Sequence, residues 1–211
     1  MSTKNSVSDL EYFVRSVGQV FTKITNGAIS SYRSLIETDN NFEGDFSKRK
    51  GNALYNSADF KDAIVYLKKA VAFDDKDVDL AYKLGVCLAK LNRDEEAIEV
   101  LEKALKLDPK HEQVLFRMGM VYLGLEKYKE AAEHFKKVTE LDESSYNAFY
   151  RLGMTYDGLK KYEDAIKAFK KAIELKPKES KTYHALGFTY ESMGNHDEAV
   201  VCFKKSMELE S

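Results

Sequence analysis

Residues 146–179 read YNAFYRLGMTYDGLKKYEDAIKAFKKAIELKPKE, and the pattern of this stretch recurs along the chain. Its glycine, first alanine and bulky apolar residue each have counterparts at intervals of 34 residues. The glycines are Gly51, Gly85, Gly119, Gly153 and Gly187; the alanines are Ala63, Ala97, Ala131, Ala165 and Ala199; the bulky residues are Leu67, Leu101, Phe135, Phe169 and Phe203. A fixed period of this length indicates a stacked repeat array.

Each period contains two apolar stripes at the 3.6-residue spacing of an α-helix. In one period they are Leu115, Met118, Gly119 and Tyr122 in residues 112–127, and Ala131, Phe135 and Val138 in residues 128–141. Residues 123–127 break the pattern between them. The sequence therefore predicts a helix pair in each repeat, in which the glycine and the alanine let the two backbones approach closely.

Small and apolar residues stand where the tetratricopeptide repeat (TPR) family places them. They are Leu84, Gly85, Leu88, Ala97, Leu101, Ala104 and Pro109 in one repeat, and Leu152, Gly153, Tyr156, Ala165, Phe169, Ala172 and Pro177 in another. The chain thus resembles this family. The resemblance implies an all-α, right-handed superhelical solenoid of five helix-turn-helix repeats, over residues 44–77, 78–111, 112–145, 146–179 and 180–211.

Residues 1–43 fall outside the repeat phase and are predicted to form a degenerate helix pair and a linker, the linker covering residues 39–44. One stripe comprises Leu10, Phe13, Val14, Val17, Phe21 and Ile24; a second, after Asn26-Gly27, comprises Ala28, Tyr32, Leu35 and Ile36. Either this segment caps the first repeat, or it is an arm that docks on a second copy. For the arm, the candidate self-association residues are Leu10, Phe13, Val17, Phe21 and Tyr32.

The last repeat has no polar capping helix after it within this sequence. Position 22 of the repeat is Glu99, Glu133 or Lys167 in the middle repeats, but it is Val201 in the last, next to Cys202. The sequence predicts an incompletely covered apolar end, which is either a contact surface or a tolerated exposed patch.

Composition excludes several classes of protein. The 33 basic and 35 acidic residues give a net charge of −2, which disfavours a nucleic-acid binder. No apolar run approaches the ~18 residues of a membrane span, and residues 1–13 do not resemble a secretory signal. Cys87 and Cys202 have no paired spacing, so we expect buried or half-buried thiols in a reducing compartment, with the cytoplasm as the default location.

Catalytic chemistry has little support. The four histidines, His111, His134, His184 and His196, form no pair at ligand spacing. There is no metalloprotease, nucleophile-elbow or phosphate-loop pattern. The sequence predicts a protein that is not an enzyme and has neither a metal site nor a cofactor.

Binding has more support. In each first helix, positions 2, 5, 6, 9, 12 and 13 lie opposite the buried stripe and line the inner wall of the superhelix. Positions 5, 6 and 9 of the five repeats hold five cations and no acid. The candidate groove residues are Lys48, Asn52, Tyr82, Lys83, Phe116, Arg117, Met120, Tyr150, Arg151, Met154, His184 and Phe188. They predict a groove for partner segments that combine carboxylates with apolar anchors.

An alternative function is that of a co-chaperone or adaptor. Lys48, Asn52 and Arg117 match the carboxylate clamp of chaperone-binding TPR domains, whereas Lys83 and Gln113 depart from it. On the outer face, lysine pairs form a ridge along the second helices. This ridge either contacts an anionic membrane or compensates helix dipoles and aids solubility.

A closer resemblance, over nearly the whole chain, is to the magnetosome-associated TPR proteins. It rests on Tyr32-Arg33-Ser34-Leu35, on Lys50-Gly51, on the run from Thr189 to Ala199, and on Phe203-Lys204-Lys205 and Glu208-Leu209. It implies a cytoplasmic scaffold that assembles with itself through its N-terminal segment, coats the magnetosome membrane peripherally and recruits magnetosome membrane proteins.

Overall fold

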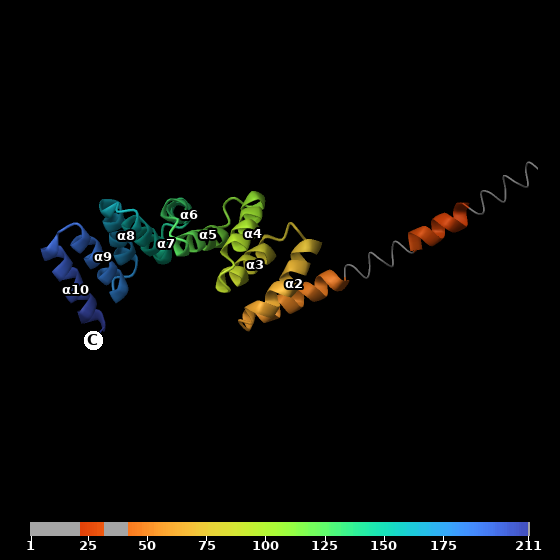
Figure 1. Cartoon of the computed structure of the whole chain (residues 1–211), viewed down its shortest axis with the longest axis horizontal. Helices are drawn as coiled ribbons and strands as arrows, with labels where there is room; N and C mark the ends of the chain where they lie inside the picture. Colours follow the sequence, from red (N-terminus) through yellow and green to blue (C-terminus); the bar gives the residue numbers. More distant parts are fainter. Residues whose placement is uncertain (1–21, 32–41, 211) are drawn as a thin grey trace, which may run out of the picture.

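The computed structural model describes residues 22–31 and 42–210, and all regular elements within them are α-helices. Residues 22–31 form one helix and residues 42–56 another. The following helices are α2 (Phe60–Phe73), α3 (Val78–Lys90), α4 (Asp94–Leu107), α5 (Glu112–Gly124), α6 (Tyr128–Leu141), α7 (Tyr146–Gly158), α8 (Tyr162–Leu175), α9 (Ser180–Ser192) and α10 (His196–Glu210). From residue 42 onward they form an elongated array of helix pairs, with α10 at one end and the helix over residues 42–56 at the other (Figure 1). The predicted all-α repeat superhelix is confirmed.

The two helices of each pair touch at the periodic glycine. A Cβ atom on Gly119 would lie 2.8 Å from the ring of Phe135, and one on Gly153 would lie 2.7 Å from the ring of Phe169. The other three periodic glycines, Gly51, Gly85 and Gly187, have the same relation to Leu67, Leu101 and Phe203. Since real Cβ contacts are longer than this, only glycine permits the observed approach of the two helices.

Neighbouring pairs share one apolar core. Ala81 of α3, Leu101 of α4 and Met118 of α5 belong to the same cluster of buried side chains. Leu152 of α7 packs in the same way into the cluster around Phe135. Complete burial of a leucine, methionine or phenylalanine side chain contributes about 1.5–3 kcal/mol to folding stability. Because much of this area is buried between repeats, each repeat depends on its neighbours for stability.

The turn inside each pair has a conformation that the sequence did not reveal. Ala58, Asn92, Glu126 and Lys160 all have φ between 55° and 59°, and Gly194 has φ of 79°. These positions are 34 residues apart, and only the last carries the residue that adopts positive φ without strain. In the second pair the amide of Arg93 donates to the carbonyl of Leu88, which is the hydrogen bond of a Schellman cap.

Two expectations about the N-terminal segment were wrong. The helix over residues 22–31 runs through Asn26 and Gly27, where a break was predicted. One glycine costs about 1 kcal/mol in a helix, which does not end it. Residues 42–44, predicted to be linker, belong to the first helix of the array, where Gly44 lies against Phe73. The five self-association candidates, Leu10, Phe13, Val17, Phe21 and Tyr32, lie outside the described residues.

Both cysteines are buried and unbridged, as predicted. Burial raises the pKa of the Cys87 thiol to about 11 and also raises the pKa of Cys202. The thiolate is the reactive form of cysteine, so both side chains act as small apolar groups at neutral pH.

His134 of α6 makes stability depend on pH. Its ring stacks on Tyr122, with 5.5 Å between the ring centroids, and its Nδ1 atom is buried without a hydrogen-bond partner. Burial, followed by the charge of Lys137, lowers the pKa of His134 below 6.5. The unfolded chain therefore binds the proton more readily, so stability is full above the unfolded pKa and falls as the pH drops below it.

We expect the melting temperature of the unmodified protein to fall more, between about pH 7.5 and about pH 5.5, than that of His134→Ala. Thermal unfolding at both pH values measures the difference. The comparison with the variant is needed because Glu191 raises the pKa of His196, which contributes with the opposite sign. Equal pH dependence of the two proteins would contradict this assignment.

Candidate functional site

The candidate groove residues lie on the helix over residues 42–56 and on α3, α5, α7 and α9, the first helices of their pairs. Lys48, His184 and Phe188 are exposed, and the other nine are half-buried. Half-buried rings and sulfurs on this wall offer a surface that is apolar but reachable from solvent.

The aromatic residues of the middle repeats are anchored in the core. Phe116 packs edge-on against Phe135, with 5.5 Å between the ring centroids, and Tyr150 lies 6.0 Å from Phe169. The ring centroid of Tyr82 lies 6.3 Å from that of His111, the residue that caps the N-terminus of α5. Each ring therefore contributes one face or edge to the wall and uses the other to hold its own repeat together.

The fourth pair brings a cation, a ring and a sulfur together. The guanidinium of Arg151 lies 5.6 Å from the centroid of Tyr150, within cation–π range. Its Nη1 atom is 3.6 Å from the sulfur of Met154. The ammonium of Lys181, on α9, also lies 5.6 Å from the centroid of Tyr150. This part of the wall is cationic without losing its apolar surface.

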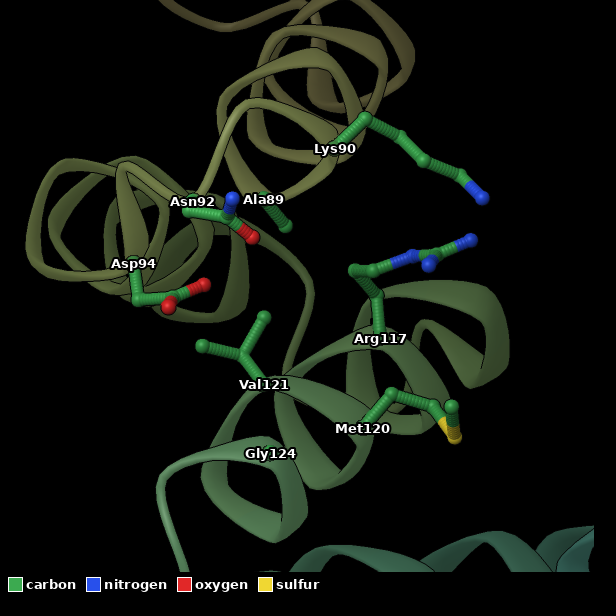
Figure 2. A pocket seen from close by; sticks show the side chains of 8 residues that line it. All are labelled: Ala89, Lys90, Asn92, Asp94, Arg117, Met120, Val121 and Gly124. Atoms are coloured by element: carbon green, nitrogen blue, oxygen red, sulfur yellow. The ribbon is translucent and has the colours of Figure 1, made fainter.

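A pocket of about 270 Å³ opens where α3 ends and α5 passes. Figure 2 shows Arg117 and Lys90 extending to the same side of it, with Met120 below Arg117 and with Asn92 and Asp94 on the facing wall. The Nε atom of Arg117 is buried without a hydrogen-bond partner. Among the described residues, neither Arg117 nor Lys90 forms an ion pair. Two adjacent cations of this kind bind a carboxylate through charge-assisted hydrogen bonds.

The comparison of positions 5, 6 and 9 missed Lys90. This residue stands at position 13 of its repeat, which also faces the inner wall. Reading position 13 together with position 6 of the following repeat would have paired Lys90 with Arg117, because stacking brings those two helices together.

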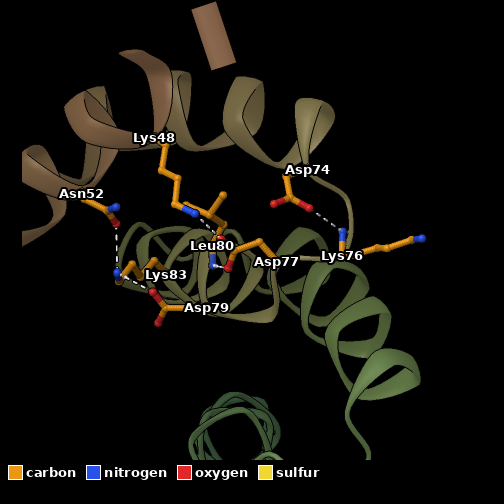
Figure 3. A network of polar contacts seen from close by, with 8 residues as sticks. All are labelled: Lys48, Asn52, Asp74, Lys76, Asp77, Asp79, Leu80 and Lys83. Atoms are coloured by element: carbon orange, nitrogen blue, oxygen red, sulfur yellow. Dashed lines mark hydrogen bonds and ion pairs between the residues drawn. The ribbon is translucent and has the colours of Figure 1, made fainter. Parts of the chain in front are cut away.

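Two of the candidate groove cations, Lys48 of the first pair and Lys83 of the second, already have partners (Figure 3). The ammonium of Lys48 donates to Asp77 at 2.7 Å, and this contact raises the pKa of Lys48. Asp77 also caps α3 by accepting from the amide of Leu80 at 3.0 Å. Burial acts to raise the pKa of Asp77, but the hydrogen bonds from Lys48 and Leu80 together lower it.

Lys83 is engaged in the same network. Its ammonium donates to Asp79 at 2.6 Å and to the side-chain oxygen of Asn52 at 2.9 Å. Two of the three residues that match a carboxylate clamp, Lys48 and Asn52, thus have intramolecular partners. The third, Arg117, retains its capacity for a ligand.

On the outer face, at least one lysine of each pair in the ridge forms an ion pair with an acid of the same or a neighbouring helix. The ion pairs are Lys68–Glu96, Lys69–Glu43, Lys136–Glu140, Lys171–Glu174 and Lys205–Glu208. Such exposed pairs contribute roughly 0–1 kcal/mol each. This pairing favours the interpretation that the ridge compensates helix dipoles and aids solubility.

Residues 22–31 and 42–210 contain no group of three or more histidine, cysteine or acidic side chains that could hold a metal ion. In the same ranges, no helix combines the length and the apolar character that crossing a membrane requires.

Three family models match the chain. One is described as anaphase-promoting complex, cyclosome, subunit 3, and matches residues 56–138. Two are tetratricopeptide repeat models, which match residues 146–179 and 168–201. No curated protein sequence matches the chain.

Solved structures give a closer relation. MamA from Desulfovibrio magneticus RS-1 is 32% identical, with a TM-score of 0.77; the match covers 80% of this chain and 95% of that one. A MamA structure from AMB-1 is 33% identical, with a TM-score of 0.74, over 78% of this chain and 98% of that one. A MamA structure from MSR-1 is 32% identical, with a TM-score of 0.73, over 79% and 96%. The chain has the same repeat core as these structures, and its sequence identity to them extends over nearly their whole length. The chain therefore belongs to the MamA family of tetratricopeptide repeat proteins.

Proposed function

We propose that this protein is a non-enzymatic scaffold that binds acidic-apolar segments of partner proteins along its inner wall. The observation that carries the proposal is the pair of Arg117 and Lys90, which lack a carboxylate partner in the described chain, beside the adaptable side chain of Met120. A ligand carboxylate would bind Arg117 and Lys90, and an apolar side chain of the same ligand would pack against the sulfur of Met120.

The proposal includes assembly and location. By resemblance to the magnetosome-associated TPR proteins, the protein assembles with itself through residues 1–43 and coats the magnetosome membrane from the cytoplasmic side. Its partners are then magnetosome membrane proteins that present acidic-apolar segments, and its own contact with the membrane is peripheral. The TPR fold and the identity to MamA structures support a scaffold of this kind.

Arg117→Glu should weaken binding of a peptide that alternates glutamate with leucine or phenylalanine by about 10–100-fold, the value of one lost charge-assisted hydrogen bond. Fluorescence anisotropy of the labelled peptide measures the affinity. Lys103→Glu makes the same change of charge on the outer face, where Lys103 pairs with Glu99, and should leave the affinity unchanged. If both variants bind as the unmodified protein does, the groove has no part in recognition.

The co-chaperone alternative requires a free C-terminal carboxylate held by Lys48, Asn52 and Arg117. The contacts of Lys48 with Asp77 and of Asn52 with Lys83 occupy two of these three residues. Amidation of the peptide's C-terminus separates the two functions, because it abolishes recognition of a terminal carboxylate and leaves recognition of glutamate side chains intact.

Removal of residues 1–41 should convert an oligomer into a smaller species, if residues 1–43 form the docking arm. Multi-angle light scattering of the full chain and of a chain starting at Phe42 measures the change in mass. The shortened chain retains the helix pairs that form the shared core. Identical masses at the same concentration would remove N-terminal docking from the proposal.

A further inference from the structure

The last helix of the array exposes apolar residues that every earlier repeat covers. Val200 and Met207 of α10 are 63% and 64% exposed. In the earlier repeats the residues equivalent to Val200 are buried or half-buried; Ile64 is 4% exposed and Ala132 is 9% exposed. Thr139, an equivalent of Met207, is 8% exposed. Earlier residues at these positions are covered because a following repeat packs against them.

The aromatic residues next to this face extend it. Phe203 is half-buried, whereas its equivalents Leu67, Leu101, Phe135 and Phe169 are at most 1% exposed. Phe188 of α9 packs edge-on against Phe203, with 5.1 Å between the ring centroids, and is itself 54% exposed. We call Phe188, Val200, Phe203 and Met207 the tail face.

The first helix of the array, at the opposite end, also exposes large apolar side chains. Phe46 is 51% exposed, and Phe42, one turn earlier on the same helix, is 72% exposed. The equivalents of Phe46 in the later repeats, Leu80, Val114, Ala148 and Thr182, are at most 1% exposed. They are buried partly against the preceding repeat, as Val114 is in the cluster that contains Leu101 and Ala104 of α4. We call Phe42 and Phe46 the head face.

We propose that the tail face of one copy binds the head face of a second copy, so that the repeat stack continues from one chain into the next. Phe46 then takes the position of Val114, and Phe203 takes the position of Leu101, in a junction that copies an internal one. The two faces lie at opposite ends of the array (Figure 1), so a single copy does not close this contact on itself. The proposal deepens the proposed scaffold function, on whose self-assembly it rests.

Charge permits this contact. The helix over residues 42–56 carries three cations and two acids, and α10 carries four acids and two cations, so the net charges have opposite signs. Lys50 stands where later repeats have the buried residues Leu84, Met118, Leu152 and Leu186. Its stem can lie on the tail face with the ammonium in solvent. This makes the junction weaker than an internal one and therefore reversible.

The symmetry of such a contact gives a sharp test. A head-to-tail interface joins two different surfaces, so it propagates into a ring or a filament and can be blocked at either surface separately. In the full-length chain, Phe46→Glu blocks the head and Met207→Glu blocks the tail. Both substitutions are at exposed positions, and the circular dichroism spectrum verifies the fold. Val65→Glu, at an exposed apolar position of α2 outside both faces, is the control.

Sedimentation velocity should show Val65→Glu assembling as the unmodified chain does, and each blocked variant associating at least about tenfold more weakly, because a charge would be buried without a partner. An equimolar mixture of Phe46→Glu and Met207→Glu should give dimers with one copy of each. Blocked variants that assemble like the unmodified chain, or a mixture without such dimers, would overturn the proposal. Loss of assembly only on removal of residues 1–41 would leave N-terminal docking standing and reject the junction; the reverse pattern would reject N-terminal docking alone.

Discussion

Phe135→Ala is expected to lower the free energy of unfolding by about 3–5 kcal/mol, the usual cost of deleting a fully buried aromatic ring. Phe135 is 0% exposed; its ring lies over Gly119 and packs edge-on against Phe116. Because the cluster also contains Leu152 of the next pair, the cavity weakens a contact within the repeat and one between repeats.

Urea denaturation followed by circular dichroism measures this loss. The matched control is Phe42→Ala, which removes the same atoms from a ring that is 72% exposed and should change stability little. Similar losses for the two variants would mean that Phe135 is not the central side chain of its cluster.

Gly119→Ala is expected to lower stability by about 1–3 kcal/mol, even though alanine favours helices by about 1 kcal/mol over glycine. The new methyl would lie 2.8 Å from the Phe135 ring, which cannot retreat within a packed core. Gly124→Ala, in the same helix, tests the opposite sign: its methyl would meet nothing within 4 Å, so stability should rise by about 0.5–1 kcal/mol.

Chemical denaturation of both variants beside the unmodified protein measures the two effects. Because both substitutions are glycine to alanine within α5, their difference in stability isolates the close approach of the helices from helix propensity. A gain in stability for Gly119→Ala would contradict the close contact of α5 and α6.

The inner wall shows how far residue patterns reach. Positions 5, 6 and 9 identified a basic, ring-lined surface, but they could not separate cations that are free for a ligand from cations that have partners. Lys48 is bound to Asp77, the residue that caps the N-terminus of α3, and Lys83 is bound to Asp79 in the first turn of α3. Arg117 has no such partner, because the stacking places Lys90, another cation, beside it.

For residues 42–210, the sequence alone determined the helix pairs, their number and their order, because the same glycine, alanine and bulky residue recur every 34 residues and each has a local packing reason. It also predicted buried cysteines and an incompletely covered apolar end. The residues that the end of the array leaves exposed are Val200 and Met207, whereas Val201 stands at a position that is exposed in the first repeat as well, as Val65. These properties follow from residues close in sequence or from a strict period.

Only the tertiary structure decided which side chains meet across repeats. The pairing of Lys48 with Asp77 and the unpaired Nε atom of Arg117 depend on the rotation between successive helix pairs. The exposure of Phe46 and Met207 depends on which side chains at the two ends of the described array are left without a neighbouring pair. That rotation is set by the summed packing of several helices, which a one-dimensional pattern does not contain.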